Sequence, residues 1–74
     1  INDEWQIRNI EKYPDSVVTI KNREGEEVFR SLGYKEMWEG DYQGKRLPSD
    51  LYHYSIDLYG DGKEVIKGKV SIFR

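Results

Sequence analysis

Few side chains in this sequence could serve as a nucleophile, a general base or a metal ligand. His53 is the only histidine and the chain has no cysteine, which excludes a thiolate nucleophile and a cysteine-based zinc site. His53 falls on the polar side of an alternating run, where an ordinary solvated side chain is expected. No serine lies in the glycine-flanked turn that strains a hydrolase nucleophile. We therefore predict that the chain is not an enzyme, and we expect no metal site and no cofactor.

The acidic residues do not form a recognisable calcium or glycosidase site. Asp57, Asp61 and Glu64 do not follow the EF-hand loop, in which oxygen ligands recur at alternate positions and end in a Glu. A glycosidase pair needs a cleft, and a thin domain has little room for one. The stretch GDYQGK at residues 40–45 lacks the spacing of a phosphate-binding loop. Asp61-Gly62 is better explained as a plain turn.

Aromatic side chains are the remaining candidates, because they could stack on a sugar or on the side chains of a partner. Tyr52 and Tyr54 alternate with Ile56 along one run, which favours packing in a core. Tyr42 lies between two glycines, and the sequence leaves open whether it packs or contacts a ligand. Trp38 is equally consistent with an anchor for a loop and with a plain core residue.

The chain of 74 residues is expected to form one domain with a thin core. At this length only about 60% of the surface exposed by the unfolded chain is buried. The net charge is −2, and 12 basic residues are interspersed with 14 acidic ones. We therefore expect no binding of nucleic acid or of an anionic membrane. No apolar run approaches the roughly 20 residues of a membrane span, so no membrane insertion is expected.

The N-terminus gives no address for the protein. The sequence begins at Ile1, without an initiator Met and without a signal peptide. We therefore expect a piece of a longer protein, a processed product or an engineered fragment.

Short alternating runs separated by Gly, Pro, Asn and Asp predict an all-β fold. Gly25 can take the positive φ of a hairpin between the second and third runs, and Asp61-Gly62 suits a type I′ turn between the last two. Residues 31–38 are expected to form a loop with one helical turn or a bent edge strand. The pattern favours a small antiparallel β-sandwich. The clear runs are residues 5–10, 17–22, 26–31, 51–59 and 65–74.

Within each run, alternate residues are predicted to point into the core. Their neighbours, which include Lys21, His53, Lys67 and Lys69, are predicted to point away from it. The inward set is Trp5, Ile7, Val18, Ile20, Tyr52, Tyr54, Ile56, Leu58, Ile66, Gly68, Val70 and Ile72.

Many short motifs follow one another along the chain in a defined order. They are Asn2-Asp3, Trp5, Ile7, Ile10, Tyr13-Pro14, Val18, Ile20, Asn22-Arg23 with Gly25, Val28-Phe29, Tyr34, Trp38 with Gly40, Tyr42 with Gly44-Lys45 and Leu47-Pro48, Tyr52 with Tyr54 and Ile56-Asp57-Leu58, and Lys67-Gly68 with Val70, Ile72 and Arg74. Each motif alone is weak, but in this order and spacing they resemble the gliding-motility-associated C-terminal domain. This family is also called the type B sorting domain of type IX secretion, and the resemblance covers nearly the whole chain.

The resemblance implies an immunoglobulin-like β-sandwich, of about six to seven short strands, at the end of a large secreted or cell-surface protein. It implies a non-catalytic sorting signal that the outer-membrane secretion machinery recognises. We expect a single domain over residues 1–74, acting as a monomer. The family usually has a Pro-Asn-Gly-Asp-Gly stretch before the Ile-Asn-Asp with which this chain begins, so we expect the N-terminal lead-in to be truncated.

Four departures from the family pattern stand out. The sequence has Lys21, Glu24 and Lys69 where the family has an aromatic or apolar residue, and it has residues 49–51, Ser-Asp-Leu, in place of Glu-Gly-Thr. The three charged residues are predicted to face away from the core, where they raise solubility and weaken any contact made there. Two explanations fit these departures: a divergent natural member, or a sequence redesigned on the family's backbone.

Three hypotheses about function follow. In the first, the secretion machinery recognises edge strands and the loop at residues 38–48, with Trp38, Gly40, Tyr42, Gly44, Leu47 and Pro48 as the candidate recognition residues. In the second, the chain is an immunoglobulin-like binding or adhesion module whose loop aromatics contact a glycan or a protein. In the third, it is an engineered stable domain with no activity of its own.

Overall fold

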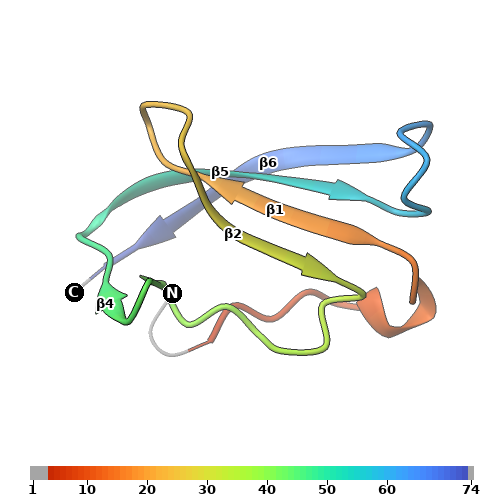
Figure 1. The fold of residues 1–74 in the computed structure, drawn as a ribbon, viewed down its shortest axis with the longest axis horizontal. Coiled ribbons are helices and arrows are strands. Elements are labelled where there is room, and N and C mark those ends of the chain that lie inside the picture. The colour runs from red at the N-terminus through yellow and green to blue at the C-terminus, as the bar shows by residue number, and fades with distance from the viewer. Residues whose placement is uncertain (1–3, 74) are drawn as a thin grey trace.

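The computed structural model describes residues 4–73, and this part of the chain is an all-β, sandwich-like domain (Figure 1). All strand pairs are antiparallel, as the alternating runs predicted. A four-stranded sheet has the order β2-β1-β5-β6, and a two-stranded sheet pairs β3 with β4. The elements are the 3-10 turn η1 (Ile10–Lys12) and the strands β1 (Val17–Lys21), β2 (Glu27–Leu32), β3 (Asp41–Tyr42), β4 (Lys45–Arg46), β5 (Asp50–Asp57) and β6 (Val65–Ile72).

The β1–β2 hairpin forms where Gly25 predicted it. Gly25 has a φ of 86°, a conformation that an L side chain disfavours. The side chain of Asn22 stabilises the turn, because its Oδ1 accepts the backbone N–H groups of Glu24 and Glu26 at 3.0 and 2.9 Å. The turn thus depends on one glycine and one asparagine that the sequence places three residues apart.

A β-bulge in β2 turns two consecutive apolar residues toward the core. Ile20 lies opposite Phe29, but the next residue, Lys21, lies opposite Glu27. Val28 is therefore the extra residue of the bulge. Val28 is buried and Phe29 is half-buried, whereas strict alternation would expose one of them. The bulge thus adds an apolar side chain to a core that is short of them.

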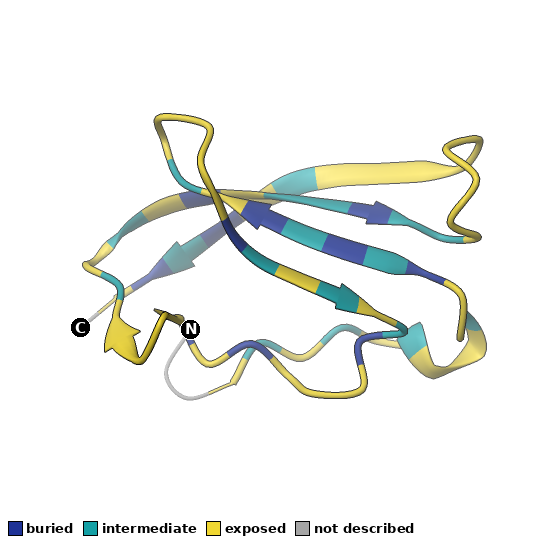
Figure 2. Cartoon of the chain, in the orientation of Figure 1, coloured by how far each residue is buried: buried dark blue, intermediate teal, exposed yellow. Residues whose placement is uncertain are grey.

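The core lies between the four-stranded sheet and a second layer of mostly irregular chain (Figures 1 and 2). The second layer consists of the N-terminal segment and the connection between β2 and β3. Trp5 packs against Tyr54 and Tyr34, with ring centroids 5.0 and 5.9 Å apart. The buried apolar residues are Val18, Ile20, Val28, Tyr34, Trp38, Tyr52, Ile56, Val70 and Ile72.

The strand predicted over residues 5–10 is wrong. Asn9 takes the left-handed conformation with a φ of 65°, and η1 follows immediately. Trp5 and Ile7 are nevertheless half-buried, while Gln6 and Arg8 are exposed. The alternation therefore predicted correctly which side of the segment faces the core. It did not show whether the segment pairs with a neighbouring strand. The segment expected over residues 31–38 begins as the end of β2, and residues 33–40 form a loop. This loop contains neither the expected helical turn nor a further bent strand.

The type I′ turn predicted at Asp61-Gly62 is also wrong. Positive φ angles occur at Gly60 and Gly62, but not at Asp61, and a type I′ turn needs two consecutive residues with positive φ. The carboxylate of Asp57 instead organises a longer connection, because it accepts the N–H groups of Gly60 and Gly62 at 3.1 and 2.9 Å. The hairpin itself between β5 and β6 is confirmed.

The inward face of β6 is only partly covered. Val70 and Ile72 are buried, but Ile66 is 48% exposed. The part of β6 around Ile66 is exposed, as its colouring shows (Figure 2). The prediction of an inward Ile66 is therefore right for the direction of the side chain and wrong for its burial.

Gly68 supplies the space for an aromatic ring. It lies directly opposite Tyr54 in the β5–β6 ladder, and a Cβ atom built on Gly68 would lie 2.7 Å from Cε2 of Tyr54. Two non-bonded carbon atoms cannot approach so closely, so the ring of Tyr54 fits over position 68 only because Gly68 has no side chain. Trp5 packs on the same ring, and this contact places the second layer over the sheet.

We expect Gly68→Ala to destabilise the domain by about 1–3 kcal/mol, the usual range for overpacking a core. Urea unfolding followed by circular dichroism measures this change. The matched control is the same substitution in a Tyr54→Ala background, where it should have a much smaller effect. An equal loss in both backgrounds would show that the ring of Tyr54 is not the cause.

Candidate functional site

The predicted recognition loop forms a small, exposed hairpin of β3 and β4. Asp41 lies opposite Arg46, and Tyr42 lies opposite Lys45. The two connecting residues, Gln43 and Gly44, have φ angles of 53° and 79°. Positive φ at both central positions is the geometry of a type I′ turn, whose twist suits two antiparallel strands.

Trp38 anchors this hairpin from below. Its side chain is 1% exposed, and its ring packs against Phe29 and Tyr52, with centroids 6.2 and 5.8 Å away. The indole N–H donates to the carbonyl oxygen of Asp41 at 3.1 Å. A core residue thus holds the first residue of β3. The sequence left open whether Trp38 anchors the loop or packs in the core, and in the structure it does both.

Backbone contacts close the base of the hairpin. The carbonyl of Gly40, a buried residue with a φ of 79°, accepts the N–H of Leu47 at 2.9 Å. Leu47 packs half-buried against the core. Pro48 is exposed, and its carbonyl oxygen accepts the hydroxyl of Tyr52 at 3.0 Å. The hairpin is therefore fixed on both sides to residues of the core.

Of the six predicted recognition residues, three are accessible. Trp38 and Gly40 are buried and Leu47 is half-buried, so these three position the hairpin; the accessible ones are Tyr42, Gly44 and Pro48. Tyr42 is 42% exposed, and its hydroxyl accepts a hydrogen bond from the side chain of Gln43 at 3.2 Å. Tyr42 is thus the one aromatic that the hairpin displays.

Tyr34 links the hairpin anchor to the N-terminal segment, a role that the sequence did not reveal. Its buried hydroxyl donates to the carbonyl of Trp5 and accepts the N–H of Trp38 at 2.9 Å. The N–H of Trp5 in turn donates to the carbonyl of Trp38 at 2.8 Å. The available signal was Gly33-Tyr34, a glycine before an aromatic in a segment without periodicity. Tyr34 has a φ of 51°, so the chain bends sharply where its ring enters the core.

Burial raises the pKa of Tyr34 above its ordinary value of 10.0. The charge of Glu4 raises it further, whereas the hydrogen bond from the N–H of Trp38 stabilises the phenolate and opposes the shift. The neutral hydroxyl is the form that can donate to Trp5. The folded state therefore holds this proton more tightly than the unfolded chain does.

No three metal-ligating side chains gather anywhere in residues 4–73. His53 is exposed on the outer face of the main sheet, as predicted, and the carboxylate of Asp57 is engaged by the turn that follows β5. No helix in the described part of the chain is long and apolar enough to cross a membrane.

The three charged departures from the family pattern face solvent, as predicted. Lys21, Glu24 and Lys69 are all exposed. Lys21 and Lys69 lie opposite His53, on either side of β5. Two of the departures therefore meet in one row across the outer face of the main sheet. Asn2-Asp3 and Arg74, which also carry the resemblance, lie outside the described residues.

We expect the stability that Tyr34 confers to be present below about pH 10 and to be lost as the pH rises through the raised pKa of the folded state. Tyr34→Phe should lower the free energy of unfolding by about 1–3 kcal/mol near neutral pH, because it leaves two buried backbone groups unpaired. The difference between wild type and Tyr34→Phe should shrink above about pH 10. Urea unfolding at several pH values measures both effects.

The matched control for this experiment is Tyr59→Phe, which removes the hydroxyl of an exposed tyrosine. Its free energy of unfolding should follow the wild type at every pH. A constant difference between Tyr34→Phe and wild type across the alkaline range would contradict the assignment.

A comparison with family models matches residues 1–72 to the CHU_C Type IX secretion signal domain. No curated protein and no solved structure matches the chain.

Proposed function

We propose that this chain, which belongs to the CHU_C type IX secretion signal domain family, is recognised as a folded surface through its β3–β4 hairpin. Membership makes the chain a C-terminal type IX sorting signal, which interacts with the secretion machinery. The family is a non-catalytic signal family, and its domain belongs to a secreted or cell-surface protein. We further propose that the β3–β4 hairpin forms the binding surface and that the outer-membrane part of the machinery binds it.

The observation that carries the proposal is the exposed ring of Tyr42 on a hairpin whose base is fixed. Trp38 holds β3 through its indole N–H, and the hydrogen bond from Leu47 to Gly40 closes the base. A rigid hairpin loses little conformational entropy on binding, so more of the contact energy appears as affinity. Exposed tyrosines on fixed backbone are frequent anchors of protein interfaces.

The edges of the main sheet supply a second element of this surface. β2 and β6 are the outer strands of the four-stranded sheet in the described part of the chain. An outer strand offers backbone N–H and C=O groups to an added strand of a partner. We infer that the outer-membrane part of the secretion machinery docks on the hairpin and on one of these edges.

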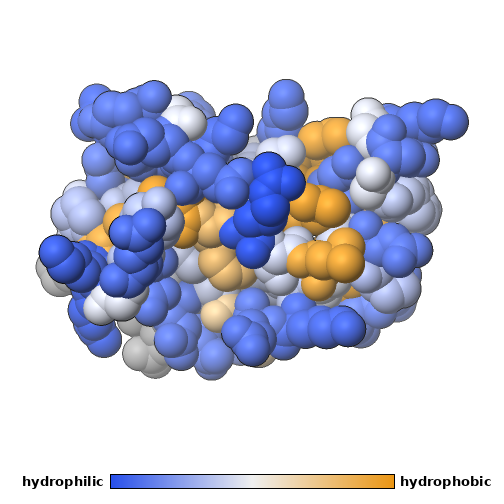
Figure 3. All heavy atoms as spheres, viewed as in Figure 1, coloured by the Kyte–Doolittle hydropathy of each residue, from blue (hydrophilic) through white to orange (hydrophobic). Residues whose placement is uncertain are grey.

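We also infer that residues 1–74 act as one monomeric domain. On the face seen in Figure 3, hydrophobic atoms form small patches separated by hydrophilic ones. Stable self-association generally needs a larger continuous apolar area. The net charge of −2 adds some mutual repulsion between copies.

The test is a reporter protein fused upstream of the domain in a cell with an active type IX system. Tyr42→Ala should reduce export of the reporter by about tenfold or more, since truncating an aromatic anchor weakens an interface by that order. The measurement compares the reporter in the medium and on the cell surface with the reporter in the periplasm.

Tyr59→Ala is the matched control, because it removes an exposed tyrosine from the opposite part of the fold. Both variants should retain the circular dichroism spectrum of the wild type, and Tyr59→Ala should lower the melting temperature somewhat because it loses the ring contact with Tyr13. Wild-type export by Tyr42→Ala would show that the hairpin is not what the machinery reads. Retention of the unmodified fusion in the periplasm, with the domain folded, would count against recognition of this chain altogether.

A further inference from the structure

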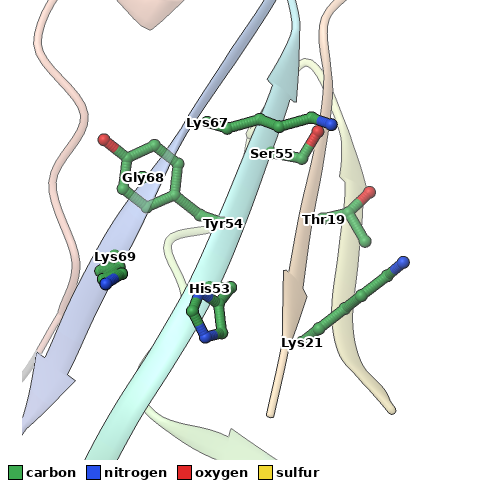
Figure 4. Close-up of a pocket in the computed structure, with 8 residues that line it drawn as sticks. All are labelled: Thr19, Lys21, His53, Tyr54, Ser55, Lys67, Gly68 and Lys69. Carbon is green, nitrogen blue, oxygen red and sulfur yellow. The ribbon is translucent and has the colours of Figure 1, made fainter. Parts of the chain in front are cut away.

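The outer face of the main sheet, which points away from the core, carries a shallow basic hollow. The hollow has a volume of about 450 Å³ and spans β1, β5 and β6 (Figure 4). Thr19 and Ser55 contribute hydroxyl groups near its centre. In Figure 4 the side chain of Lys67 extends from β6 across β5, on the side of Ser55. The side chains that line this outer side are Thr19, Lys21, His53, Ser55, Lys67 and Lys69.

Of the lysines of the hollow, Lys21 lies opposite Glu27 and interacts electrostatically with its carboxylate. None of Lys21, Lys67 and Lys69 takes part in an ion pair among residues 4–73, and all three are exposed. The two acidic side chains that share this face are already engaged. Glu27 accepts hydrogen bonds from Arg30 at 3.1 and 2.8 Å, and Asp57 binds the turn after β5. The hollow is therefore a concentrated positive region on a chain whose net charge is −2.

The backbones of the three lysines are spread over the hollow. Lys21 and Lys69 lie opposite His53 on its two sides, so two strand spacings, or roughly 10 Å, separate their backbones. Lys67 and Lys69 are two residues apart along β6, or roughly 7 Å. A ligand with several negative groups at similar intervals can engage all three without drawing their side chains together.

We propose that this hollow binds an acidic, extended segment of a protein partner. Alternate side chains of an extended segment recur on one face at roughly 7 Å, which matches Lys67 and Lys69. The hydroxyls of Thr19 and Ser55 can donate to carboxylate oxygens between them. A long polyanion such as DNA would also meet the repulsion of the remaining acidic surface, whereas a short segment meets the hollow alone. The hollow is a different surface from the β3–β4 hairpin, so this proposal does not depend on the proposed function.

The test measures the fluorescence anisotropy of a labelled peptide, with Glu and Thr at alternate positions, on titration with the 74-residue chain. The peptide should bind, and binding should weaken as salt is added, because exposed charges are screened. The double variant Lys67→Gln, Lys69→Gln should weaken binding by about tenfold, since it removes two surface ion pairs. A peptide with Gln in place of Glu should not bind.

The matched control is Lys12→Gln, Lys63→Gln, which makes the same change of charge at two exposed lysines outside the hollow. This variant should bind the Glu peptide nearly as well as the wild type. Equal weakening by both double variants would overturn the proposal, because the attraction would then follow net charge rather than the hollow. Binding of polyphosphate or anionic vesicles without binding of the Glu peptide would also overturn it, as would self-association of the chain that is lost in Lys67→Gln, Lys69→Gln.

Discussion

The fold depends on the hydrogen bonds and ring contacts that fasten an irregular second layer to a regular sheet. The hydroxyl of Tyr34 joins the carbonyl of Trp5 to the N–H of Trp38, and Trp5 returns a bond to the carbonyl of Trp38. Without these bonds, the N-terminal segment would bury polar backbone groups without partners, at a cost of about 1–3 kcal/mol each. Trp38 also connects the core to the β3–β4 hairpin, because its indole N–H donates to the carbonyl of Asp41. Core packing and the shape of the displayed hairpin are thus determined by the same few residues.

Sequence periodicity predicted the sheet well, because each strand has one face in the core and one in solvent. The inward direction of Val18, Ile20, Tyr52 and Ile56 is confirmed by their burial, and the outward lysines are confirmed by their exposure. Periodicity failed where the chain is half-buried without being paired. Trp5 and Ile7 alternate with polar residues, yet no strand within residues 4–73 forms a ladder with them. An alternating pattern reports burial of one side and does not report hydrogen-bond partners.

Turn chemistry and long-range contacts were harder to read from the residues. Asp61-Gly62 has the better type I′ sequence, but Asp57 captures the N–H groups of that loop and selects another conformation. The type I′ geometry occurs at Gln43-Gly44 instead, in a hairpin that the hydrogen bond from Leu47 to Gly40 closes. The candidate site was therefore located by its motif, whereas its division into buried anchors and exposed residues required the structure. The link through Tyr34 joins residues 29 positions apart, and no local pattern encodes such a contact.

The unequal construction of the two layers has a consequence for how the domain yields under load. The main sheet is held by ladders of backbone hydrogen bonds, interrupted only by the bulge at Val28. The other layer is held by side chains and isolated bonds, which open at lower free energy than a ladder does. A pulling force or a narrow passage would therefore detach the N-terminal segment first and leave the four strands intact. The second layer is therefore the mechanically weaker part of the domain, and it contains the first described residues.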